Sequence, residues 1–106
     1  MTTGAPELIV GRGVVDEIVR LAAYEVPGVA RVSRGGSALR AFVAGPPIVT
    51  RRAEGRVRVR IWIVARPGQS IVALAREVRA AVGAAVQRLL ALELESVIVT
   101  VDGVGG

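Results

Sequence analysis

The sequence predicts an α+β domain of two layers, with two helices packed on one face of a mostly antiparallel sheet. Two observations lead to this prediction. Residues 56–65 alternate strictly between apolar and other side chains, which is typical of a strand with one buried face, and two other stretches repeat apolar residues at spacings of three and four. In chain order the expected elements give a split β-α-β-β-α-β pattern. The 106 residues fit one domain covering residues 1–106.

The first part of the chain predicts a strand, a helix and a second strand. Glu7 to Val10 is the first strand, and a helix follows from Arg12 to Glu25. The helix should end before Pro27, because proline disfavours helical geometry at the preceding residue, and Pro27 and Gly28 suit the centre of a type II turn. Val29 to Ser33 is the next strand. The apolar residues at helical spacing are Val14, Val15, Ile18, Val19, Leu21 and Ala22.

A hairpin is expected in the middle of the chain. Ser33 to Gly36 predicts a loop, and no element is assigned from there to Pro47. Ile48 to Arg52 predicts a strand that turns through a three-residue loop, Ala53 to Gly55, into the alternating strand at Arg56. In that strand the residues expected to face the core are Val57, Val59, Ile61, Ile63 and Ala65.

The last part predicts a long helix and a closing strand. Ser70 is expected to cap the helix. Residues 96–104 read SVIVTVDGV, a β-branched run typical of a strand. The expected inner stripe of the helix is Ile71, Leu74, Ala75, Val78, Val82, Ala85 or Val86, and Leu89, and its outward residues are Arg76, Glu77, Arg79, Gln87 and Arg88.

Composition restricts the possible functions. The chain has no cysteine and no histidine, and all 14 of its basic residues are arginine, so the usual thiol, imidazole and amine groups of catalysis are missing. Asp16 and Glu17 diverge on a helix, and Glu93 and Glu95 fall in an expected loop, so no carboxylate pair or metal site is indicated. We therefore expect a protein that is not an enzyme and has no cofactor or metal.

Charge and hydropathy indicate the kind of partner. The formal net charge of +5 favours acidic partners, whether nucleic acid, anionic lipid or acidic protein. The N-terminus lacks the pattern of a secretory signal, and no apolar run reaches the roughly 20 residues needed to span a bilayer. We expect a soluble chain without a transmembrane segment.

An arginine-rich strand face is the candidate binding surface. Three interpretations remain open: a solvated face that blunts edge pairing, an interface for protein or lipid, and a nucleic-acid surface. Trp62 would provide a stacking ring, but it stands alone where sheet-based RNA binders usually show two or three aromatics. The candidate residues are Arg51, Arg56, Arg58, Arg60, Trp62 and Arg66, with Arg52 beside Arg51 on the neighbouring strand.

Several motifs together resemble one bacterial family. The segments LAAYEVPGVARVS, GRVRVRIWIVARPGQSI, ALAREVRAAVGAAVQRLLAL and VIVTVDGV, between Glu7 and Val104, are similar to the alkaline shock protein family, also called the envelope stress response family. One departure is the usual glycine near the end of the second helix, in a pattern like TGL, which here reads ALEL.

The resemblance implies a small, non-enzymatic α+β domain of the cytoplasm, held near the membrane by a membrane-anchored partner and linked to cell-envelope homeostasis. No catalytic residues come with the family. The function hypothesis is an interaction module that binds a partner protein or its own copies at the cytoplasmic side of the membrane. The alternative is a small nucleic-acid-binding protein that uses the arginine-rich strand face.

Overall fold

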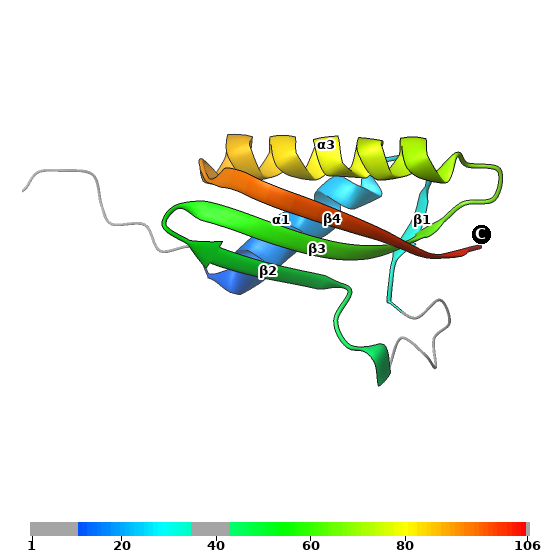
Figure 1. Cartoon of the computed structure of the whole chain (residues 1–106), viewed down its shortest axis with the longest axis horizontal. Helices are drawn as coiled ribbons and strands as arrows, with labels where there is room; N and C mark the ends of the chain where they lie inside the picture. The colour runs from blue at the N-terminus through cyan, green and yellow to red at the C-terminus, as the bar shows by residue number, and fades with distance from the viewer. Residues whose placement is uncertain (1–10, 35–42, 106) are drawn as a thin grey trace, which may run out of the picture.

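The computed structural model describes residues 11–34 and 43–105 and forms one sheet with two long helices (Figure 1). The expected strand at residues 7–10 lies outside the described residues. In chain order the elements are α1 (Arg12–Tyr24), β1 (Val29–Val32), β2 (Ile48–Ala53), β3 (Arg56–Ala65), α3 (Ile71–Leu90) and β4 (Glu93–Val104).

Strand β3 is the centre of the sheet. Strand β4 runs parallel to it along one edge, from Arg56 to Ala65, so β2 and β1 must share the other edge. On that edge β2 pairs antiparallel with residues 56–61 and β1 pairs antiparallel with residues 63–65. Helix α3 supplies the crossover that a parallel neighbour requires. Two of the three pairings are antiparallel, so the predicted α+β class and mostly antiparallel sheet are confirmed.

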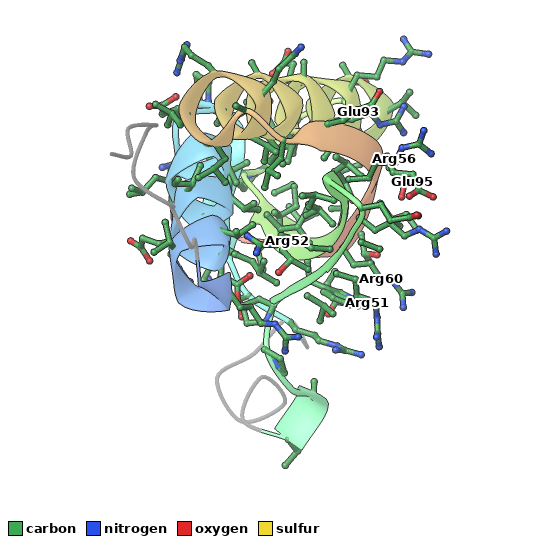
Figure 2. All side chains as sticks on the ribbon, turned by 90° about the vertical axis from the view of Figure 1, so that its left-hand side faces the viewer. Arg51, Arg52, Arg56, Arg60, Glu93 and Glu95 are labelled. Atoms are coloured by element: carbon green, nitrogen blue, oxygen red, sulfur yellow. The ribbon has the colours of Figure 1, made fainter. Side chains whose placement is uncertain are left out.

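Both helices pack on the same face of the sheet, and aliphatic side chains fill the space between the layers (Figure 2). Every residue of β3 that the alternation assigned to the core is buried. In α1 the buried residues are Val15, Val19, Ala22 and Ala23, whereas Val14 and Leu21 are exposed. In α3 they are Leu74, Val78, Val82, Ala85 and Val86.

Both ends of the predicted α3 stripe are wrong. Ile71 and Leu89 are exposed. Ile71 is the first residue of the helix, and Leu89 is rotated off the buried side. Leu90 lies four residues after the buried Val86, and it packs against the core instead. The predicted cap is confirmed, since the Ser70 side chain accepts a hydrogen bond from the backbone N–H of Ala73.

The turn after α1 differs from the predicted type II turn. The backbone N–H of Val29 donates to the carbonyl of Val26 over 3.0 Å, but Gly28 does not have the positive φ that a type II turn requires. Glycine is needed there for space. A Cβ at Gly28 would lie 2.5 Å from Oε1 of Gln69 and 2.8 Å from Cδ1 of Leu74.

The hairpin loop is shorter than predicted. Ala53 pairs with Arg56, so the connection is the two-residue turn Glu54–Gly55 rather than a three-residue loop. The φ angles of these residues are 55° and 76°, and two consecutive positive values are typical of a type I′ turn, whose twist matches that of the strands it joins.

Candidate functional site

Four of the predicted site residues gather on the side of the sheet that faces away from the helices. Arg56, Arg58 and Arg60 alternate with buried residues of β3 and are exposed. Arg51 of β2 lies directly opposite Arg58, so the two side chains share a face. Figure 2 shows Arg51, Arg56 and Arg60 projecting from this side. We call this surface, made by Arg51, Arg56, Arg58 and Arg60, the arginine face.

Two arginines of this face are held by carboxylates of β4. Arg56 Nε lies 3.3 Å from Glu93 Oε1, and Arg58 Nη2 lies 2.8 Å from Glu95 Oε2. The expectation that both glutamates lie in a loop is wrong, because β4 begins at Glu93. A register shift between Leu94 and Ser96 inserts Glu95 as an extra residue opposite β3.

The Arg58–Glu95 pair stays charged at neutral pH. The hydrogen bond that Arg58 donates to Glu95 lowers the pKa of that carboxyl group below its ordinary value, and the charges of Arg58 and Arg56 add to the effect. The same hydrogen bond, with the charge of Glu95, raises the pKa of Arg58. The two glutamates therefore neutralise two of the four guanidinium groups and leave an excess of two positive charges.

Arg51 and Arg60 carry that excess. Within residues 11–34 and 43–105 neither forms an ion pair. Arg51 faces the like charge of Arg58 directly across the strand pair, an arrangement that destabilises a sheet. Within the described residues no ion pair of Arg51 itself offsets this repulsion.

The arginine face also contains an open hollow of about 470 Å³, within the size range of ligand sites. Its apolar part includes Val49 of β2 and Ile98 of β4, whose side chain is 50% exposed. Arg51, Arg58 and Arg60 stand around it. Glu95 and Ser96 line it as well. The hollow therefore has an apolar part bordered by three arginines and one carboxylate.

Trp62 lies on the outward side of β3 but is covered. Only 9% of the residue is accessible, and the guanidinium carbon of Arg34 lies 4.0 Å from the centre of its ring. The guanidinium of Arg60 lies 5.5 Å from the same ring, within the range of a cation–π interaction. The ring is therefore not an open stacking platform in this structure.

Two other arginines lie apart from the arginine face. Arg66 follows the end of β3, and its Nε donates to the carbonyl of Pro27 over 3.0 Å. Arg52 pairs with the buried Val57, so its side chain starts on the helix side of β2, and Figure 2 shows it on that side. The side chains of Arg52 and Arg66 therefore do not project from the arginine face, although Arg52 borders a hollow of about 350 Å³ together with Arg51, Arg56 and Arg58.

Sequence reasoning missed Arg34, Glu93 and Glu95. Residues 93–95 alternate between polar and apolar side chains just before the β-branched run, and this alternation is the signal that could have extended the predicted last strand to Glu93. No local signal places Arg34 over Trp62, because this contact depends on how β1 pairs with β3.

The described residues contain neither a candidate membrane-spanning helix nor a candidate metal site. No helix among them is both long and apolar enough to cross a membrane. In the same part of the chain no group of three or more acidic side chains could hold a metal ion.

Comparison with known proteins gives one family match. The model of the alkaline shock protein (Asp) family, described as having a cell envelope-related function, matches residues 2–105. No curated protein sequence matches the chain at a significant level.

Solved structures of MamM CTD share the fold. A histidine-to-alanine variant has a TM-score of 0.57 and 22% identity, over 88% of this chain and 98% of that one. A manganese form has a TM-score of 0.57 and 24% identity, over 88% and 99%. A zinc form has a TM-score of 0.56 and 23% identity, over 86% and 84%. At these identities the likeness shows the fold alone.

Proposed function

Because this chain belongs to the alkaline shock protein family, whose function is cell envelope-related, we propose that it is a non-enzymatic interaction module. In this proposal it binds a partner protein at the cytoplasmic side of the membrane, and a membrane-anchored partner holds it there. The family match confirms the resemblance found in the sequence. The observation that carries the proposal is the open arginine face, where Arg51 and Arg60, which form no ion pair within the described residues, border a partly apolar hollow together with the Arg58–Glu95 pair.

The chemistry of the arginine face favours an acidic protein segment. Arginine binds carboxylates with two parallel hydrogen bonds and is enriched at protein interfaces. The exposed side chain of Ile98 gives a partner apolar area to bury beside those charges. A segment that alternates acidic and aliphatic side chains would satisfy both features.

The side-chain inventory supports a function without catalysis. The sequence has no histidine, cysteine or lysine. Among the carboxylates, Glu93 and Glu95 are held by arginines, and Asp16 accepts a hydrogen bond from Thr50 Oγ1 over 2.9 Å. These contacts engage the three carboxyl groups with other side chains, which supports the proposal of a function without catalysis.

The proposal is tested by recovery of proteins from a bacterial membrane fraction on immobilised protein. We expect the wild-type chain to retain an envelope protein that the double variant Arg51→Gln/Arg60→Gln loses. The matched control is Arg76→Gln/Arg79→Gln, which removes the same charge from exposed positions of α3. Equal recovery by both variants, or recovery of nucleic acid alone, would contradict the proposal.

The only tryptophan of the chain offers a second test with purified protein. Because the Trp62 ring lies 5.5 Å from the Arg60 guanidinium, an anionic peptide bound at Arg60 should change the fluorescence of Trp62. We expect a saturable change with a synthetic peptide of alternating glutamate and valine, weakened by salt. The same peptide with glutamine in place of glutamate is the control. If the peptide does not change the Trp62 fluorescence at low salt, the proposal that the partner segment is acidic is wrong.

Nucleic acid is the alternative ligand, favoured by the row of unneutralised cations at Arg51 and Arg60. Affinity for single strands should then fall steeply with salt, with a log–log slope that decreases by about one for each phosphate-contacting arginine removed. Trp62→Ala should weaken binding if the ring becomes uncovered for stacking. Absence of binding at low salt would dismiss this alternative.

A further inference from the structure

The helix side of the domain has an apolar groove of its own. It lies between α1 and α3 and has a volume of about 130 Å³. Leu21 of α1 and Leu89 of α3 line it and are 55% and 59% exposed. Ile18 and Ala85 also line it. The two leucines therefore leave apolar surface exposed to water, and burying that surface against another molecule would be favourable.

One acid and one base border this groove. Glu25 is the C-terminal cap of α1, and no basic residue occupies the last turn of that helix. A carboxylate at the negative end of a helix dipole is unfavourable unless a cation lies nearby. Arg88 comes from α3 and lines the same groove. Within the described parts of the chain neither residue forms an ion pair.

We propose that a second copy of this chain docks on the groove with two-fold symmetry. In a two-fold interface, if residue i of one copy contacts residue j of its partner, then j also contacts i. Glu25 of each copy would meet Arg88 of the other, and the Leu21 and Leu89 side chains would pack between these two ion pairs. The groove surface is thus complementary to a second copy of itself, because it has one acidic residue, one basic residue and apolar side chains between them.

The arginine face is a poor alternative surface for a second copy. Two arginine faces placed together would bring like charges into contact, since each has an excess of two positive charges. We therefore assign self-association to the groove between the helices and partner binding to the arginine face. This inference does not depend on the proposed function, because the two surfaces share no residue.

Charge reversal tests the proposal by sedimentation velocity of the full chain. Glu25→Arg and Arg88→Glu should each weaken self-association at least about tenfold, because each places two like-charged pairs across the two-fold axis. An equimolar mixture of the two variants should associate, since one copy then presents two arginines to two glutamates. The double variant Glu25→Arg/Arg88→Glu should regain self-association.

The control is Glu77→Arg, which makes the same change of charge at an exposed position of α3 outside the groove. It should associate as the wild type does. Circular dichroism checks the fold of each variant; Glu25→Arg places a cation at the negative end of α1 and should not lower stability. Wild-type chain that stays monomeric up to about 1 mM, single variants that associate normally, or a mixture that stays monomeric would each overturn the proposal.

Discussion

Replacement of Gly28 by alanine tests the finding that this glycine is required for space and not for its backbone angle. The added Cβ would lie 2.5 Å from Gln69 Oε1 and 2.8 Å from Leu74 Cδ1. Both distances are too short for an alanine side chain, so one or more groups must move. The two neighbours differ in their freedom to do so.

The cost follows from that difference. Gln69 is exposed and can rotate away, but Leu74 is only 1% exposed and is confined by the core. Overpacking of this kind costs about 1–3 kcal/mol. Loss of the glycine's freedom in the unfolded chain offsets about 0.4–1 kcal/mol of that cost. We therefore expect Gly28→Ala to lower the free energy of unfolding by about 1–2 kcal/mol.

Urea unfolding followed by circular dichroism measures this value. Gly13→Ala is the matched control, because Gly13 lies in α1 with no atom within 4 Å of an added Cβ, and alanine there should stabilise the chain by about 0.5–1 kcal/mol. The double variant Gly28→Ala/Gln69→Ala should keep most of the loss, since Leu74 remains in place. Equal or higher stability of Gly28→Ala would refute the steric explanation.

Three further predictions concern the turns, the arginine face and pH. Glu54 and Ala91 both have a φ of 55°, so Glu54→Asn and Ala91→Gly should each raise the free energy of unfolding by about 0.5–1 kcal/mol; a decrease in urea unfolding would contradict the assigned backbone. Arg51→Thr should raise stability by removing the charge opposite Arg58 while abolishing binding of the acidic peptide; lower stability would show that Arg51 supports the fold. The pKa of Glu95 is lowered from its ordinary value of 4.5, so its contribution is present above that value and is lost as the pH falls through the lowered pKa. The stability difference between wild type and Glu95→Gln should therefore be present at pH 7 and vanish in acid, and a difference that persists in acid would contradict this.

The inward side of β3 was predictable because burial of one face imposes a period of two on a strand. Val57, Val59 and Ile61 follow this rule, and each is fully buried. The cover over the outward side was not predictable, because it depends on contacts between distant segments. Arg34 covers Trp62, and Gly105 lies close to Val64.

The candidate site was predictable only in part. Alternation placed Arg56, Arg58 and Arg60 on one face, as the structure shows. The position of Arg51 relative to Arg58 depends on the hairpin register, which a loop of two residues instead of three shifts. The glutamates that neutralise two of the four arginines of the arginine face come from a parallel strand far along the chain, and no local pattern specifies that pairing.

The helices that form the groove lie on one side of the sheet, and the labelled residues of the arginine face project from the other side (Figure 2). Copies joined through their helices would therefore hold their cationic surfaces pointing outward and apart. Such a dimer would bind two separate target molecules, one on each arginine face, rather than enclose a single one. Its apparent affinity would then rise with the density of targets, because the second attachment occurs at the high local concentration that the first one creates.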